Sequence, residues 1–272
     1  MDKLRIALDR AKGKRESPEP SILSHRPDPR QGLPDSIVYK QTRSVEAPLS
    51  HMRENRVIAA YEENEVVHSY KILRTQVLHR MRENGWNVLG VTSPGEKEGK
   101  TVTAVNLAIS LAMEEGQTVL LVDADLPNPG VHRVLGIGRD RGLAEYLLED
   151  IPLRSLLVHP GLGRLVLLPG GRRMGRSAER LTSPKMVALT VELKHRYPTR
   201  MVLFDLPPLL HSADVLAFSP HLDALLLVVE AGRTKREEIE KALHLLRGVP
   251  IIGTVLNKGR ESGADSHPGP ST

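Results

Sequence analysis

The residues best suited to chemistry stand in one short stretch, where Gly99, Lys100 and Thr101 follow an apolar run and precede a helical pattern. In such a strand–loop–helix arrangement, the backbone N–H groups of the loop surround phosphate oxygens. The lysine ammonium then reaches the β- and γ-phosphates, and the threonine hydroxyl can bind Mg²⁺. We therefore expect this loop to bind the phosphates of a nucleotide.

The loop departs from the general phosphate-binding pattern at its start and in its charge. Pro94 stands where that pattern has its first glycine, and Gly95 follows it. Glu96, Lys97 and Glu98 lie inside the loop, and we expect their side chains to point outward because backbone groups hold the phosphates. The alternative is an ordinary strand–turn–helix connection. It is disfavoured because the apolar strand, the Gly-Lys-Thr sequence and the helix follow one another at the spacing of a phosphate-binding loop.

Carboxylates end two further apolar runs. Asp123 and Asp125 follow residues 119–122, and Asp205 follows residues 201–204. The carboxyl ends of parallel strands meet at the edge of a sheet where ligands bind. A single aspartate at a strand end is more often a helix cap or turn residue, but a carboxylate there can also hold Mg²⁺ directly or through water. The three strand ends together favour a nucleotide site.

Alternating strand and helix patterns provide the scaffold for these side chains. Strands are predicted over residues 87–92, 118–123, 164–168, 200–205, 224–229 and 251–256. Helices are predicted over residues 62–83, 101–115, 142–149, 184–196 and 235–247. Strands that are apolar along their whole length and separated by helices indicate an α/β fold. We expect a doubly wound, mostly parallel sheet of the P-loop NTPase class.

The chain divides by composition into an arm, a domain and a tail. Residues 1–56 are predicted to form a basic amphipathic N-terminal arm followed by a Pro-rich disordered linker. The short helix at the start is either a frayed, solvated helix or a docking element for a partner or anionic lipid. Residues 57–258 form the nucleotide-binding domain, and residues 259–272 a disordered tail.

Composition excludes several classes of protein. Lys and Arg number 38 against 33 Asp and Glu, and the first 60 residues, with 12 basic and 8 acidic side chains, supply most of the net charge of +5. No nucleic-acid-binding face is therefore expected on the domain. Without cysteine there is no disulfide, thiolate zinc site or cysteine nucleophile. No secretory leader or membrane-spanning run is apparent, so a cytoplasmic protein is expected.

Several segments resemble one family of proteins. The resemblance rests on residues 69–75, 91–107, 119–125, 167–171, 202–208 and 253–258. These segments resemble the bacterial tyrosine kinases of capsule and exopolysaccharide synthesis, especially the stand-alone cytoplasmic kinases linked to exosortase-type loci. The resemblance covers residues 60–258.

The resemblance implies an ATP-dependent protein-tyrosine (auto)kinase that regulates exopolysaccharide biosynthesis or export. It assigns catalytic roles to Lys100, Asp123 and Asp125, with Asp123 accepting the tyrosine proton, and implies ATP and Mg²⁺ as cofactors. The magnesium ligands would be Thr101, Asp123 and Asp205. The nucleotide-binding residues would be Gly95, Glu96, Lys97, Glu98, Gly99, Lys100, Thr101 and Val102, with Asn257 beside the adenine.

The resemblance also implies partners. These are a membrane-anchored polysaccharide chain-length protein that activates the kinase, tyrosine-containing protein substrates and further copies of the chain as a homo-oligomer. No nucleic-acid partner is expected. The protein would then be cytoplasmic and peripheral at the inner membrane through its partner.

Three positions differ from the family pattern. Pro127 replaces the arginine of Asp-x-Asp-x-Arg, and no tyrosine follows Asn257. The oligomerisation pattern Glu-x2-Arg-x2-Arg reads His68-x2-Lys71-x2-Arg74. Two other functions therefore stay open: an ATP-binding or ATP-hydrolysing switch, and a positioning ATPase of the MinD/ParA-like class. Positioning ATPases carry a lysine five residues before the Walker lysine, where this chain has Gly95, and that difference favours the kinase.

Overall fold

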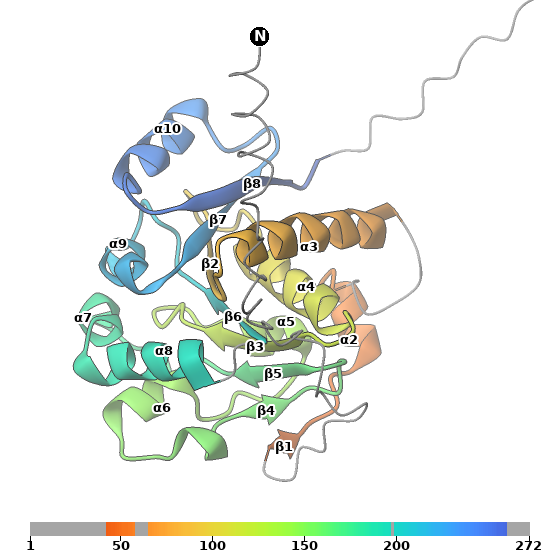
Figure 1. Ribbon diagram of the computed structural model, residues 1–272, viewed down its shortest axis with the longest axis vertical. Helices are drawn as coiled ribbons and strands as arrows, with labels where there is room; N and C mark the ends of the chain where they lie inside the picture. Colours follow the sequence, from red (N-terminus) through yellow and green to blue (C-terminus); the bar gives the residue numbers. More distant parts are fainter. Residues whose placement is uncertain (1–41, 58–64, 197–198, 260–272) are drawn as a thin grey trace, which may run out of the picture. The chain divides into compact units, whose positions relative to one another are not determined.

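The computed structural model describes residues 42–57, 65–196 and 199–259, which build a sheet with helices on both faces (Figure 1). Its eight strands lie in the order β1-β4-β5-β3-β6-β2-β7-β8. They span Arg43–Ser44 (β1), Val88–Thr92 (β2), Thr118–Asp123 (β3), Val158–His159 (β4), Leu165–Leu168 (β5), Arg200–Asp205 (β6), Ala224–Glu230 (β7) and Ile251–Asn257 (β8). All neighbours are parallel except β4 and β5. The predicted α/β fold with a doubly wound, mostly parallel sheet is confirmed.

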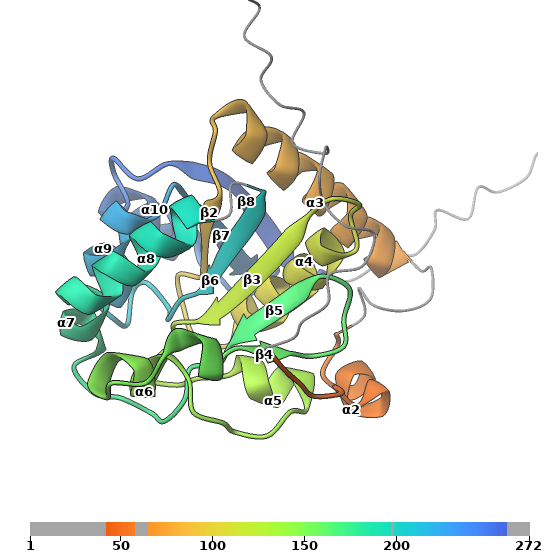
Figure 2. The ribbon, with the colours of Figure 1, turned by 60° about the horizontal axis from the view of Figure 1, so that its bottom comes forward.

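The helices form a layer on each face of the sheet, and Figure 2 shows α3 and α4 on the opposite side from α8 and α9. One layer holds α2 (Leu49–Glu54), α3 (Glu65–Glu83), α4 (Lys100–Ala112) and α5 (Val131–Leu135). The other holds α6 (Leu143–Leu148), α7 (Ser177–Leu181), α8 (Pro184–Arg196), α9 (Asp214–Phe218) and α10 (Arg236–Leu245). In the described part of the chain, no helix combines the length and apolar character needed to cross a membrane.

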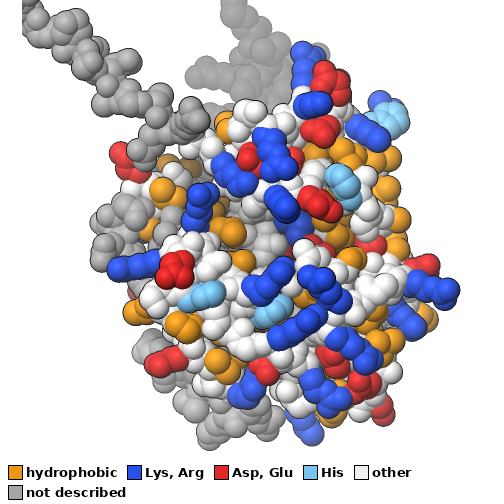
Figure 3. All heavy atoms as spheres, turned by 180° about the vertical axis from the view of Figure 1, so that it is seen from behind, with side chains coloured by type: hydrophobic (Ala, Val, Ile, Leu, Met, Phe, Trp, Pro, Cys, Tyr) orange, Lys and Arg blue, Asp and Glu red, His pale blue; other side chains and the backbone are white. Residues whose placement is uncertain are grey.

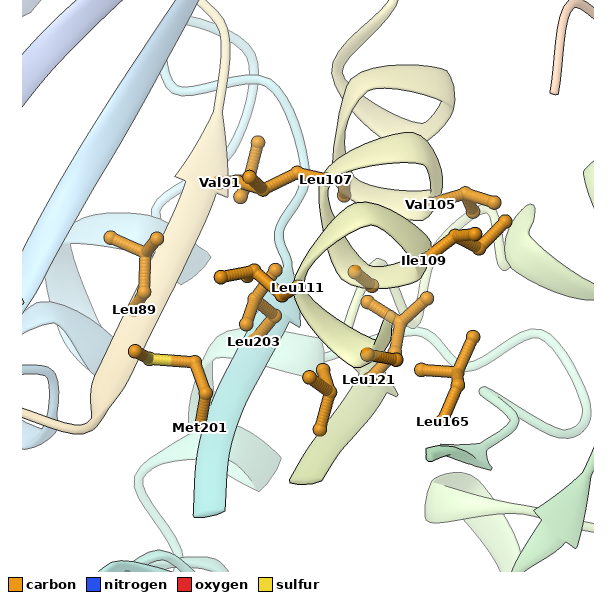
Figure 4. Close-up of a cluster of buried hydrophobic side chains, with 14 of the residues drawn as sticks. Leu89, Val91, Val105, Leu107, Ile109, Leu111, Leu121, Leu165, Met201 and Leu203 are labelled. Carbon is orange, nitrogen blue, oxygen red and sulfur yellow. The ribbon is translucent and has the colours of Figure 1, made fainter. Parts of the chain in front are cut away.

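Each face of the sheet has its own apolar core. Successive side chains of a strand point to opposite faces, so Leu121 of β3 joins the core beneath α4 while Leu120 and Val122 join the other. Figure 4 shows the first core, in which Leu107 and Leu111 of α4 point toward the strand side chains. Because both faces are covered, the central strands are apolar throughout, which is the pattern seen in the sequence.

The domain begins earlier than predicted. The backbone N–H of Val45, just after β1, donates to the carbonyl of His159 at 2.9 Å, and Met52 and Val57 are fully buried. The prediction of a linker up to residue 56 is therefore wrong for residues 42–56, whose two elements are too short to show a period. Pro48, read as a linker signal, is instead the residue that precedes α2. Residues 1–41 and 260–272, with the predicted arm helix and tail, lie outside the described residues.

The helix predicted over residues 62–83 is present as α3, and its buried face is formed by several apolar side chains. Val67, Val77 and Met81 are buried, whereas Val66 is 45% exposed. Of the apolar pair Val66-Val67, only the second residue faces the interior. The last two turns of α3 anchor the helix to the core.

Candidate nucleotide-binding site

The site lies at the carboxyl ends of β2, β3 and β6, which are neighbours in the sheet. The chain leaves β2 into the loop of residues 93–99 and enters α4 at Lys100. Asp123 ends β3 and is the register partner of Asp205, which ends β6. The fold therefore brings together the three strand ends that the sequence singled out, as the geometry of parallel sheets requires.

The Lys100 ammonium is held among the acidic side chains. Its Nζ donates to Asp125 Oδ2 at 2.6 Å and to Thr101 Oγ1 at 3.3 Å, and lies 3.8 Å from Asp205 Oδ1. Burial lowers the pKa of Lys100, but the Asp205 and Asp125 carboxylates outweigh this effect and raise the pKa above its ordinary value. The lysine is thus a fixed positive charge at the end of the loop.

Asp123 is fully buried, and only one of its two carboxylate oxygens accepts hydrogen bonds from the described residues. Its Oδ2 accepts hydrogen bonds from the backbone N–H groups of Gly130 at 2.9 Å and Val131 at 3.0 Å, whereas Oδ1 has no hydrogen-bond partner among the described residues. Burial, reinforced by the Asp205 carboxylate, raises the pKa of Asp123 to about 8, against the opposing effects of the Val131 N–H and Lys100. This carboxylate can therefore accept or hold a proton near neutral pH.

Asp205 is fully buried, and neither of its oxygens has a hydrogen bond from any described residue. Burial raises the pKa of Asp205 to about 6, while the Lys100 ammonium opposes the change. The nearby Thr101 hydroxyl also favours the ionised form, without completing a hydrogen bond. Buried carboxylate oxygens are nearly always paired, so these oxygens indicate a site for a positively charged group.

The residues predicted to bind Mg²⁺ fit that ion. Asp123 Oδ1 and both oxygens of Asp205 are buried acceptors without a hydrogen bond in the described chain, and Thr101 adds a hydroxyl near Asp205. The described residues contain no group of three or more His, Cys, Asp or Glu side chains arranged as a complete metal cage. Mg²⁺ needs none, because it is bound through one or two carboxylates, substrate phosphates and retained waters.

Glu98 contradicts the expectation that every charged residue of the loop points outward. Glu96 and Lys97 are exposed, but Glu98 is 4% exposed. Its carboxylate accepts the Gly95 N–H at 2.9 Å and the hydroxyl of Thr234, from the connection after β7, at 2.6 Å. Glu98 therefore closes the loop internally and ties it to the end of a neighbouring strand.

Asn257, at the end of β8, also braces the loop. Its side-chain amide donates to the Glu98 carbonyl at 2.9 Å. Gly99 has φ of +95°, and a Cβ there would lie 2.0 Å from Asn257 Nδ2, so only glycine fits. Contact of Asn257 with adenine stays a prediction. Next to it, Lys258 donates to the carbonyl of Lys97 at 2.7 Å.

The remaining predicted site residue, Val102, lies in the first turn of α4, half-buried. Two residues that shape the loop were not anticipated, namely Thr234 and Lys258. Nothing in their local sequence marks them, because their contacts depend on the side-by-side placement of β7, β8 and β2. The brace formed by Asn257, Lys258 and Thr234 is therefore a product of the sheet order.

A central parallel strand that enters a glycine-rich loop, the helix after it, and a second strand ending in a buried aspartate define a P-loop nucleotide-binding protein. Residues 89–267 match the family model described as the CobQ/CobB/MinD/ParA nucleotide binding domain. The tyrosine-protein kinase YwqD of Bacillus subtilis (strain 168) is 30% identical over 210 residues, which are 76% of this chain and 87% of that protein. The chain therefore belongs to the bacterial tyrosine-protein kinases within this nucleotide-binding family.

Solved structures agree with this assignment. The kinase domain of the Escherichia coli tyrosine kinase ETK has a TM-score of 0.69 and 25% identity, covering 85% of this chain and 93% of that one. The kinase domain of VpsO has a TM-score of 0.65 and 28% identity, covering 72% and 96%. The MinD protein of Pyrococcus horikoshii, with a TM-score of 0.55 and 24% identity, shares the fold alone.

Proposed function

We propose that this chain is an ATP-dependent protein-tyrosine kinase that regulates exopolysaccharide biosynthesis or export. The observation that carries the proposal is the position of Asp123, a buried carboxylate of raised pKa at the phosphate site, close to Lys100 and Asp205. Relatives named tyrosine-protein kinases support the reaction, and the name of ExoP of Rhizobium meliloti, a succinoglycan biosynthesis transport protein, supports the process.

The proposed reaction transfers the γ-phosphoryl group of ATP to a tyrosine hydroxyl. Lys100 and the loop N–H groups hold the phosphates, and Asp123 Oδ1 accepts the proton as the tyrosine oxygen bonds to phosphorus and the bond to the β-phosphate oxygen breaks. ADP and phosphotyrosine are the products. Thr101 and Asp205, with Asp123 beside them, would hold Mg²⁺, which would neutralise the phosphate charge. A base with pKa near neutrality suits this proton transfer.

The proposed substrates are tyrosines of other proteins. The two tyrosines that the structure describes, Tyr70 and Tyr146, are only partly exposed on helices, and no tyrosine follows Asn257 in the sequence. Burial raises the pKa of the Tyr70 hydroxyl, so this hydroxyl stays protonated. The partial exposure of the described tyrosines therefore favours acceptors on a separate substrate protein.

A membrane-anchored chain-length protein is the proposed activator. In ExoP the segment similar to this chain covers only 28% of a longer protein, which supports the idea that kinase and transport parts work together. On the face shown in Figure 3, Lys and Arg side chains gather across the middle with acidic side chains among them. Such a mixed surface suits a protein partner better than a nucleic acid, which needs a continuous basic surface.

A homo-oligomer through α3 stays a prediction. The Arg74 guanidinium, at the last position of the His68-x2-Lys71-x2-Arg74 pattern, lies 3.1 Å from Glu114 and donates to the Ser110 carbonyl at 3.1 Å. Both partners belong to the same chain, in or just after α4. Any contact between copies of the chain at this surface would therefore have to rely on other residues of α3.

The proposal is tested by incubating the full chain with Mg-ATP, alone and with a candidate membrane partner, and mapping phosphotyrosine by mass spectrometry. We expect phosphotyrosine with the wild type and with Lys241→Met, an exposed lysine of α10 outside the loop, but not with Lys100→Met or Asp205→Ala. ATP binding without phosphotyrosine on any tested protein would contradict the proposal and support the ATP-dependent switch. Dimerisation that requires ATP would instead support the positioning ATPase.

A further inference from the structure

The chain lacks two basic residues that the related sequence patterns contain. Pro127 stands at the arginine position of Asp-x-Asp-x-Arg, and Gly95 stands where positioning ATPases have a second lysine. Phosphoryl transfer spreads negative charge over the oxygens of the transferred group, and catalysis depends on positive groups placed against it. The phosphate loop itself contributes Lys100, whose ammonium is already engaged by Asp125.

Two exposed arginines share one hydrogen-bond acceptor, Asn128, beside the site. Arg133 of α5 donates from Nη2 to the side-chain oxygen of Asn128 at 3.3 Å, and Arg173, from the loop after β5, donates from Nη2 to the same oxygen at 3.0 Å. The backbone N–H of Asn128 donates in turn to Asp125 at 3.1 Å. Within the described ranges neither guanidinium forms an ion pair with a carboxylate, so both retain their full charge for an anion.

Arg133 borders the threonine that the phosphate loop presents. A Cβ built on Gly130 would lie 3.6 Å from Arg133 Nη2 and 3.7 Å from Thr101 Oγ1, so the guanidinium and the hydroxyl face the same small space. The Gly130 and Val131 N–H groups are fixed by Asp123. The start of α5 is therefore anchored to the catalytic carboxylate, and Arg133 is carried on a rigid element.

We infer that Arg133 and Arg173, held together by Asn128, contact the γ-phosphate of bound ATP and replace the arginine missing at residue 127. The expected effect of these arginines on the reaction rate rests on the proposed phosphoryl transfer. Their expected effect on nucleotide affinity does not depend on it. Guanidinium groups suit this task because their planar donors match phosphate oxygens. Asn128 acts as a positioning residue, since it holds both arginine side chains near Asp125 before nucleotide binds.

Other nearby arginines are engaged elsewhere and provide controls. Arg139, on the segment after α5, donates to the backbone carbonyl of Gly171 at 3.4 Å. Arg172 lies 3.8 Å from Glu145 and 3.6 Å from Glu149. In the described structure neither of them is hydrogen-bonded to Asn128, which distinguishes them from Arg133 and Arg173.

The test compares the affinities of the full chain for ADP and for a non-hydrolysable ATP analogue, both with Mg²⁺, by calorimetry. In the wild type we expect tighter binding of the analogue. Arg133→Ala and Arg173→Ala should each weaken analogue binding about tenfold or more, while ADP binding stays within twofold and reports that the variant is folded. Arg139→Ala should match the wild type for both ligands.

The results separate this inference from the proposed function. The inference would be overturned if both arginine variants kept the wild-type preference for the analogue over ADP. It would also be overturned if the wild type bound the two nucleotides equally well. If the variants lose the preference but the wild type never forms phosphotyrosine, the γ-phosphate contact stands and the kinase proposal fails. If the wild type does form phosphotyrosine, the arginine variants that lose the preference for the analogue should form it more slowly.

Discussion

Lys100 donates a 2.6 Å hydrogen bond to Asp125, so the lysine of the phosphate loop is positioned by a carboxylate two residues beyond the end of β3. Both side chains are nearly buried, with 11% and 5% of their surface exposed. An ion pair in such a setting depends on its geometry, and removing one partner leaves an uncompensated charge. Asp125 therefore positions Lys100 through a direct hydrogen bond. Asp123 and Asp205 instead present carboxylate oxygens that serve proton transfer and metal binding in the proposed mechanism.

Asp125→Asn should misplace Lys100 without disturbing the fold. The amide keeps the shape of the carboxylate but loses its charge, so the lysine is no longer fixed. We expect phosphoryl transfer to fall by about tenfold to a hundredfold, the usual effect of one charged hydrogen bond. Asp150→Asn, at an exposed position away from the site, is the control. Wild-type rates in Asp125→Asn, measured by ATP turnover and phosphotyrosine formation, would show that Asp125 has no such role.

Stability should fall as the pH rises through the range set by Asp123 and Asp205. Their pKa values rise from 3.8 to about 8 and about 6 on folding, so the folded protein binds more protons than the unfolded chain between these values. Free energy of unfolding is therefore lost between about pH 4 and pH 8. Asp123→Asn should raise Tm at pH 8.5 but hardly at pH 4.

The check is thermal unfolding at several pH values without nucleotide or metal. A gain for Asp123→Asn of several degrees at high pH corresponds to roughly 1–3 kcal/mol in a chain of this size. Asp140→Asn, at a half-exposed aspartate outside the site, should show no such trend. A pH-independent difference between Asp123→Asn and the wild type would contradict the assigned pKa of Asp123.

Gly99→Ala should damage the phosphate loop in two separable ways. The new Cβ would lie 2.0 Å from Asn257 Nδ2, and the backbone φ of +95° strains any residue with a side chain. Asn257→Ala removes the first problem but not the second. We expect the double variant Gly99→Ala/Asn257→Ala to bind nucleotide better than Gly99→Ala yet more weakly than Asn257→Ala, as measured by titration. Full recovery would mean that the backbone strain is unimportant.

Residues 42–57 should contribute to the stability of the domain. Met52 is fully buried, so Met52→Ala should lower the free energy of unfolding by about 2–5 kcal/mol. Leu49→Ala, at a 58% exposed position of the same helix, should change it by less than about 0.5 kcal/mol. Urea unfolding curves give both values. Equal, small effects would place this segment outside the domain, where the sequence pattern had put it.

The sequence predicted the parts of the site that follow from regular structure. Asp123 and Asp205 were expected to meet because strands of one parallel sheet end at a common edge, and the register pairs them directly. Lys100 was expected at the end of the phosphate loop and Thr101 at the first residue of the helix, and the helix begins at Lys100. These inferences need only strand direction and local spacing.

Contacts between loops could not be predicted in the same way. Glu98 turns inward because Thr234, 136 residues later, offers a hydroxyl, and Arg133 and Arg173 meet because two loops place them on Asn128. Neither contact has a period or motif. The short β1 and α2 were missed for a related reason, since two and six residues are too few to reveal a pattern.

The most direct test of the proposed mechanism is phosphotyrosine formation by Asp123→Asn. With γ-labelled Mg-ATP and a tyrosine-containing partner, the wild type should label tyrosine, and Asp123→Asn should do so at least about a hundredfold more slowly. The amide keeps an acceptor for the Gly130 N–H but cannot take a proton. Equal labelling by both proteins, or label released only as free phosphate, would contradict the account.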